Sequence, residues 1–139
     1  MDCTCSVGQA EEGIVIADRN RKPRVLVVED DGFFTRLLKD ALAPMDVDAV
    51  YVTTVEAALE SARERMPELV LADYLLPGRD GLELLTEIGA LRDQPKRVLV
   101  TARSEVRRLW GQDIPVLFKP FKSSTLQQLV AELLSPARA

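Results

Sequence analysis

Short, continuous apolar runs that end in a polar residue recur along the chain and constrain its fold more than any other feature. The clearest is Leu69–Asp73, in which four apolar residues lead to a carboxylate and then to a loop marked by Pro77, Gly78 and Gly81. Four apolar residues are too few for a helix face, so this run predicts a buried β-strand that ends at Asp73. Similar segments predict four more strands: Val25–Val28, Val47–Val52, Arg97–Val100 and Pro115–Phe118.

Between these runs, apolar residues recur at helical spacing. The first set predicts a helix that stops before Pro44 and consists of Phe34, Leu37, Leu38, Ala41 and Leu42. The other predicted helices are one capped by Thr54 and ended by Pro67, one over Gly81–Leu91, one short and weak over Ser104–Trp110, and one capped at Ser123 or Ser124 and ending at Leu134. Alternating strands and helices favour an α/β fold with a doubly wound, five-stranded parallel sheet.

Length and charge exclude several classes of protein. With 139 residues, the chain suits one domain, which we expect at 23–135 between a mobile leader at 1–22 and a tail at 136–139. The formal net charge of -4 argues against nucleic acid as a primary ligand. No apolar run approaches the roughly 20 residues of a membrane span, and the acidic N-terminus is unlike a secretory signal. We therefore expect a cytoplasmic protein that binds neither nucleic acid nor membranes.

The two cysteines, Cys3 and Cys5, lie in the predicted leader, and the chain contains no histidine. A structural zinc site needs four nitrogen or sulfur ligands, which this chain does not supply. We therefore interpret the pair as ordinary thiols of the leader rather than as a metal or redox site.

Polar side chains stand at the ends of the predicted strands. Glu29 and Asp30 follow the first strand, Asp73 ends the third, Thr101 follows the fourth and Lys119 the fifth. Each alone has a simpler interpretation, as a helix cap, a turn residue or a surface lysine. In a parallel sheet, however, the carboxyl ends of the strands meet at one edge, and ligands of open α/β sheets bind there. The strand ends together therefore predict a functional site.

The residue types at this edge indicate phosphoryl transfer. Carboxylates a few ångströms apart repel each other by about 3 kcal/mol per pair at an effective dielectric constant near 20, so the acidic cluster needs a cation. Oxygen ligands alone suit Mg²⁺, which also binds phosphate oxygens. Lys119 and Thr101 can both contact an incoming phosphoryl group. Asp73, at the end of the central strand, is the best-placed nucleophile.

Four motifs in this order resemble the receiver domain of two-component response regulators. They are Glu29-Asp30, the stretch from Asp73 through Leu-Pro to Asp-Gly81, Thr101-Ala102, and Lys119-Pro120-Phe121, and the resemblance covers about Arg24 to Leu134. It implies a flavodoxin-like fold with strand order 2-1-3-4-5. It also implies that Asp73 accepts a phosphoryl group from a histidine kinase or a histidine phosphotransfer protein, or slowly from a small phosphodonor.

The resemblance also implies roles for the other site residues. Glu29, Asp30, Asp73 and the backbone carbonyl of Leu75 would hold Mg²⁺. Thr101 and Lys119 would grip the phosphoryl oxygens, and Ala102 would leave room beside them. The family pattern further suggests that the Lys119–Pro120 peptide bond is cis.

The chain departs from the family pattern in two respects, and two further residues bear on the lifetime of the phosphoryl group. Receivers usually carry Tyr or Phe three residues before the lysine, where this chain has Val116, and strand alternation puts Phe118 on the same face as Val116. The interval from Thr101 to Lys119 is short, which predicts a truncated fourth helix. Leu75 and Arg103 border the path of the hydrolytic water in this family, and because an apolar Leu75 does not orient water, we expect a persistent phosphoryl group.

We interpret the chain as a single-domain response regulator, a phosphoacceptor and not an enzyme acting on external substrates. Its output would be altered binding of a downstream protein or onward phosphorelay, from a monomer or weak dimer. Two alternatives are a phosphorylation-independent, receiver-like interaction module and an aspartyl-nucleophile phosphatase. The phosphatase is disfavoured because Leu75 stands where a second carboxylate would act as acid and base. A nucleotide-binding enzyme is disfavoured because no G-x-G-x-x-G or G-K-[ST] loop follows a strand.

Overall fold

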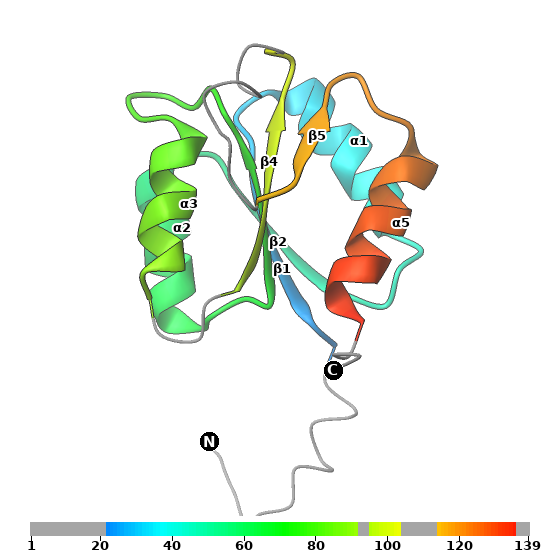
Figure 1. Cartoon of the computed structure of the whole chain (residues 1–139), viewed down its shortest axis with the longest axis horizontal. Coiled ribbons are helices and arrows are strands. Elements are labelled where there is room, and N and C mark those ends of the chain that lie inside the picture. Colours follow the sequence, from blue (N-terminus) through cyan, green and yellow to red (C-terminus); the bar gives the residue numbers. More distant parts are fainter. Residues whose placement is uncertain (1–21, 92–94, 104–113, 136–139) are drawn as a thin grey trace, which may run out of the picture.

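The computed structural model describes residues 22–91, 95–103 and 114–135. Strands and helices alternate over residues 24–101, and one more strand and one more helix follow within residues 116–134 (Figure 1). The strands are β1 (Arg24–Val28), β2 (Asp48–Val52), β3 (Leu69–Asp73), β4 (Lys96–Thr101) and β5 (Val116–Phe118). The helices are α1 (Gly32–Leu42), α2 (Val55–Glu64), α3 (Gly81–Gly89) and α5 (Ser123–Leu134). The predicted helix at Ser104–Trp110 and the predicted leader, apart from Lys22, lie outside the described residues.

The five strands form one parallel sheet in the order β2-β1-β3-β4-β5, which confirms the predicted fold. All five residues of β3 are buried, as expected for a strand covered on both faces. In the pairing of β1 with β3, Val28 lies opposite Ala72, so the next residues, Glu29 and Asp73, are level at the carboxyl edge. The second strand lies at the edge of the sheet, as the implied strand order 2-1-3-4-5 requires.

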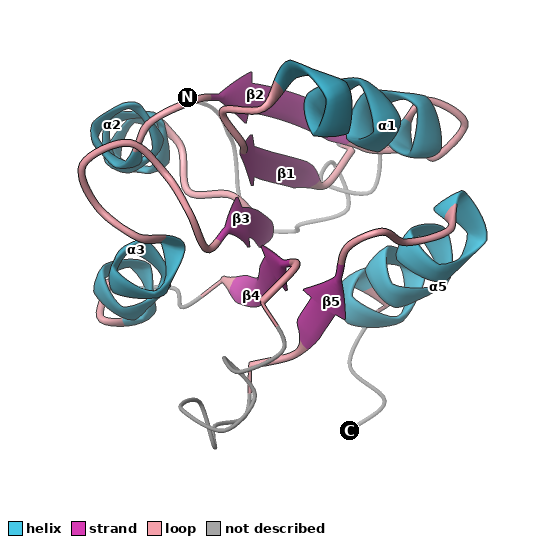
Figure 2. Cartoon of the chain, turned by 90° about the horizontal axis from the view of Figure 1, so that it is seen from above, coloured by secondary structure: helices cyan, strands magenta, loops and turns pink. Residues whose placement is uncertain are grey.

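Helices cover both faces of the sheet, α2 and α3 on one side and α1 and α5 on the other (Figure 2). Alternate strand residues face the two sides. Leu26 and Val28 belong to the core under α2 and α3, whereas Val25 and Val27 belong to the core under α1 and α5. Within the described ranges, no helix is long and apolar enough to cross a membrane.

The starts of the helices follow local capping chemistry. Asp31 caps α1 by accepting hydrogen bonds from the backbone amides of Phe33 and Phe34, and Thr54 caps α2 as predicted. The predicted cap of the last helix at Ser123 or Ser124 is wrong, because both residues lie inside its first turn and are exposed. Lys122 is the N-cap; its extended backbone lets its carbonyl accept from the amides of Thr125 and Leu126, and no side chain caps this end.

The end of α3 also differs from the prediction. The helix ends at Gly89 and not at Leu91, and a turn follows in which the amide of Leu91 donates to the carbonyl of Ile88. Leu91 still packs against the core under α2 and α3, so its apolar spacing reflected burial rather than continued helix. At the sheet edge, Val116 packs on that same core and Leu117 on the opposite one, which leaves Phe118 on the face of Val116, as the alternation predicted.

Candidate functional site

Three carboxylates gather at the carboxyl ends of the neighbouring strands β1 and β3. Glu29 and Asp30 directly follow β1, and Asp73 is the last residue of β3. One oxygen from each carboxylate lies within 4.8 Å of the others. Glu29 is 2% exposed and Asp73 8% exposed, whereas Asp30 is open to solvent. The cluster is therefore a buried pair of acids with a third acid at its mouth.

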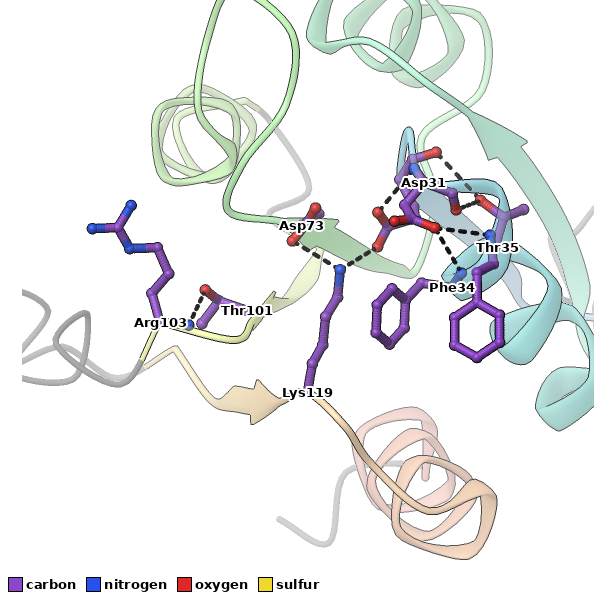
Figure 3. Close-up of polar contacts among 9 residues, drawn as sticks. Asp31, Phe34, Thr35, Asp73, Thr101, Arg103 and Lys119 are labelled. Carbon is purple, nitrogen blue, oxygen red and sulfur yellow. Dashed lines mark hydrogen bonds and ion pairs between the residues drawn. The ribbon is translucent and has the colours of Figure 1, made fainter.

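Lys119 reaches this cluster from the end of β5. Its Nζ lies 3.0 Å from Oε1 of Glu29 and 3.3 Å from Oδ1 of Asp73, and the side chain is 8% exposed (Figure 3). The backbone amide of Lys119 donates to the carbonyl of Thr101, and this hydrogen bond ties the backbone at Lys119 to the end of β4. The Lys119–Pro120 peptide bond is cis, as the resemblance suggested.

Burial dominates the electrostatics of Glu29. It raises the pKa of this carboxyl to about 7, and the negative charge of Asp73 adds to the shift. The ammonium of Lys119 and the backbone amide of Asp31, which donates to Oε2 of Glu29, act in the opposite direction. One ammonium thus pairs with two of the three carboxylates, so the cluster carries a net charge of about -2 when all groups are ionised.

This donor set fits Mg²⁺. The three candidate ligands are all oxygens, the type that Mg²⁺ prefers, and the surplus negative charge matches a divalent cation. The exposed position of Asp30 opens the cluster to solvent, where waters or a phosphate oxygen can complete the coordination.

The remaining predicted site residues line the same cleft as Asp73. Thr101 is buried and its Oγ1 accepts a hydrogen bond from the backbone amide of Arg103 at 2.9 Å, while Ala102 and Leu75 lie on the rim. Leu75 is 55% exposed and forms an isolated β-bridge with Asp80. Coordination by the carbonyl of Leu75 stays a prediction.

The loop after Asp73 depends on a close backbone approach. A Cβ at Gly81 would lie 2.0 Å from the carbonyl oxygen of Asp73, so only glycine fits there. The preceding Asp80 caps α3 by accepting from the amide of Glu83. Arg79 forms ion pairs with Glu83 and Glu87 of α3 and lies 3.8 Å from Glu56 of α2, which anchors the far side of the loop.

Sequence analysis missed one contact of the site. The ring of Phe34, assigned only to the apolar face of its helix, lies with its centroid 4.0 Å from Nζ of Lys119. One sequence pattern could have indicated the contact between Phe34 and Lys119. Phe34 is an aromatic residue in the first turn of a helix that follows an acidic strand end, and that turn starts at the edge of the sheet that carries the lysine.

Comparisons with known proteins agree with this geometry. The family model of the response regulator receiver domain matches residues 25–131. The transcriptional regulatory protein BaeR of Escherichia coli is 39% identical over 93 residues, 66% of this chain and 38% of BaeR. MalR of Bacillus subtilis is 31% identical over 114 residues, 78% of this chain and 48% of MalR. The chain thus spans half or less of the length of these curated relatives.

Solved structures show the same fold. The signal receiver domain of a LuxO repressor protein from Vibrio parahaemolyticus is 26% identical, with a TM-score of 0.73 over 81% of this chain and 90% of that domain. The receiver domain of a signal transduction histidine kinase from Syntrophus aciditrophicus is also 26% identical, with a TM-score of 0.74 over 84% of this chain and 92% of that domain. On its family model, its relatives and its fold, this chain belongs to the response regulator receiver domains of two-component signalling.

Proposed function

We propose that this protein is a phosphoacceptor switch in which Asp73 takes a phosphoryl group from a partner histidine kinase or histidine phosphotransfer protein in the cytoplasm. The observation that carries the proposal is the position of Asp73 at the open carboxyl edge, 3.3 Å from Lys119 and within 4.8 Å of two further carboxylates. Neither a structural cap nor a surface acid needs such surroundings.

In the proposed reaction, a carboxylate oxygen of Asp73 attacks the phosphorus of the donor. The new P–O bond makes an acyl phosphate, the P–N bond to the donor histidine breaks, and the imidazole keeps the electron pair and takes up a proton. Glu29, Asp30, Asp73 and the carbonyl of Leu75 would hold Mg²⁺, which when bound neutralises charge on the phosphoryl oxygens. Lys119 and Thr101 would bind the remaining phosphoryl oxygens.

The proposed output is a change in partner binding or onward phosphorelay, and not turnover of an external substrate. The side chain of Leu75 is exposed and apolar, so it has no polar group that could orient a water molecule toward the acyl phosphate. We therefore expect the phosphoryl group to persist. A dephosphorylation half-time of seconds in Mg²⁺ would contradict this expectation.

Mass spectrometry after incubation with acetyl phosphate and Mg²⁺ tests the proposal. We expect one phosphoryl group on the wild type, none on the Asp73→Asn variant and none in the presence of EDTA. Asp46→Asn is a matched control, because Asp46 is an exposed aspartate just before β2, at the opposite edge of the sheet. Phosphorylation of the Asp73→Asn variant at the wild-type level would refute the assignment of Asp73.

One observation favours a second candidate, a receiver-like module that binds its partner without phosphorylation. Val116 packs in the core under α2 and α3 and has no ring that could turn with the state of the site. The same experiment separates the candidates. A wild-type protein that takes up no phosphoryl group supports the module, and donor turnover without accumulation supports a phosphatase.

A further inference from the structure

The surroundings of the Lys119 ammonium include an aromatic face as well as two carboxylates. Nζ contacts Oε1 of Glu29 and Oδ1 of Asp73, and it lies 4.0 Å from the centroid of the Phe34 ring (Figure 3). The ammonium therefore has two ion-pair partners and one aromatic contact. The negative face of an aromatic ring attracts a cation, most strongly where water is excluded. At 8% exposure, Lys119 is in such a place.

The helix cap and a neighbouring ring set the position of Phe34. The amides of Phe33 and Phe34 donate to Oδ1 of Asp31, so the cap of α1 fixes the turn that carries the ring. The ring also contacts Phe121, just before α5, with centroids 6.4 Å apart. One aromatic side chain therefore touches both the lysine of the site and the start of α5.

We propose that Phe34 is a positioning residue that holds Lys119 between Glu29 and Asp73, and that its ring links the state of Asp73 to Phe121 and α5. The second half rests on the proposed phosphorylation of Asp73. When phosphoryl oxygens draw the Lys119 ammonium toward Asp73, the ammonium moves away from the Phe34 ring. The Phe34 ring then changes its packing on Phe121. The proposed link from Lys119 through Phe34 to Phe121 lies on the side of the sheet covered by α1 and α5, where the side chain of Gln127 donates to the carbonyl of Ala41. It does not require an aromatic residue at position 116.

Lysine-selective NMR of the full chain tests the first half without phosphorylation. The ε-methylene protons of Lys119 should be shifted upfield by the ring, relative to those of the exposed Lys96 and Lys122. The shift should vanish in Phe34→Leu, which keeps an apolar side chain, and persist in Phe34→Tyr. Phe33→Leu is the matched control. Phe33 is 67% exposed and packs edge-on against Phe34, with ring centroids 5.3 Å apart, so this variant changes the neighbouring ring but keeps the ring that faces Lys119. An unchanged Lys119 resonance in Phe34→Leu would overturn the proposal.

Kinetics and beryllofluoride test the consequence for the site. Under conditions where both variants are fully folded, phosphorylation of Phe34→Leu by acetyl phosphate should be slower by roughly threefold to tenfold, with Phe34→Tyr close to wild type. Beryllofluoride with Mg²⁺ should move the Lys119 and Phe121 resonances together in the wild type, and the Phe121 change should shrink in Phe34→Leu. Wild-type kinetics together with a full Phe121 response in Phe34→Leu would overturn the link. If the wild type takes up no phosphoryl group, the proposed function fails, whereas loss of the Lys119 shift in Phe34→Leu still supports the positioning role.

Discussion

Glu29 combines deep burial with two charged neighbours. The ammonium of Lys119 contacts it, the carboxylate of Asp73 lies nearby, and it has almost no access to water. Burial raises its pKa to about 7 because the ionised form loses hydration that one lysine does not replace. A carboxyl with a raised pKa binds its proton more tightly when the chain is folded, so it stabilises the fold at low pH.

We expect the Glu29→Gln variant to change how stability depends on pH. In metal-free buffer, the contribution of Glu29 is full below its unfolded-state pKa near 4.5 and is lost as the pH rises to about 7. Relative to the variant, the wild type should therefore lose on the order of 2–3 kcal/mol of unfolding free energy between pH 4.5 and pH 8. Urea unfolding at several pH values in EDTA measures this difference.

The control for this experiment is Glu64→Gln, which removes an exposed carboxylate from the end of α2. Its stability should follow that of the wild type at every pH. Parallel pH curves for the wild type and Glu29→Gln would show that Glu29 does not titrate as its surroundings indicate.

The sequence allowed some of these residues to be identified and not others. Glu29, Asp73 and Lys119 could be placed at one edge because each stands at the end of an apolar run and strand ends share an edge in a parallel sheet. The contact of Phe34 with Lys119 was harder to predict. The place of Phe34 in the first turn puts it near the right edge of the sheet, but the contact itself depends on how α1 is rotated against the sheet. Periodicity gives the apolar face of a helix, but not which atoms lie beyond its first turn.

At the scale of the elements, two glycines at helix starts provide a matched pair of mutations. An added Cβ at Gly81 would collide with the carbonyl of Asp73, whereas at Gly32 it would meet nothing within 4 Å. We expect Gly81→Ala to cost more than about 2 kcal/mol, because backbone and not a flexible side chain must move. Gly32→Ala should be neutral or stabilising by up to about 1 kcal/mol, since it favours the helical state of α1.

Urea unfolding of both glycine variants measures these changes in stability. Labelling with acetyl phosphate shows whether the reactivity of Asp73 changes as well. Gly81→Ala should also lower labelling of Asp73, because the colliding atom belongs to that residue's own backbone. Equal stabilities of the two variants would contradict the close approach.

The N-terminus of α5 offers a stabilising mutation. Lys122 has the extended backbone of an N-cap but makes no side-chain cap bond, and its positive charge opposes the helix dipole. We expect Lys122→Asp to raise the free energy of unfolding by about 1 kcal/mol, as its carboxylate can accept from the amides of the first turn. Lys122→Ala removes the charge without adding an acceptor and should gain less. Equal gains from both variants would assign the effect to charge alone.

Strands were predicted more accurately than helix ends. The central strands are covered on both faces, so their apolar runs are continuous and their limits sharp. Helix ends depend on which residue has the backbone conformation of a cap. In α5 the extended backbone falls at Lys122, so Ser123 and Ser124 are already helical and are not caps. Leu91 is packed against the core although α3 ends at Gly89, so its apolar side chain extended the helical spacing beyond the true end of the helix.

At the scale of the whole molecule, the surplus of carboxylates links metal binding to folding. We expect Mg²⁺ at ten times its dissociation constant to raise the free energy of unfolding by about 1.4 kcal/mol, because only the folded chain brings the ligands together. Thermal unfolding should shift upward by several degrees in the wild type and much less in Asp30→Asn. The Asp46→Asn control should respond like the wild type. The same shift with NaCl at matched ionic strength would indicate screening rather than a specific site.

The pairing of β1 with β3 has a consequence for how such a protein can change over evolutionary time. Val28 lies opposite Ala72, so the acids that follow are set side by side by the sheet itself, at roughly the 4.8 Å spacing of adjacent strands. The outer faces of the helices can then change in sequence without moving Asp73. Under the proposed function, duplicated copies of such a chain can acquire new partners through these outer faces while keeping the same reaction at Asp73.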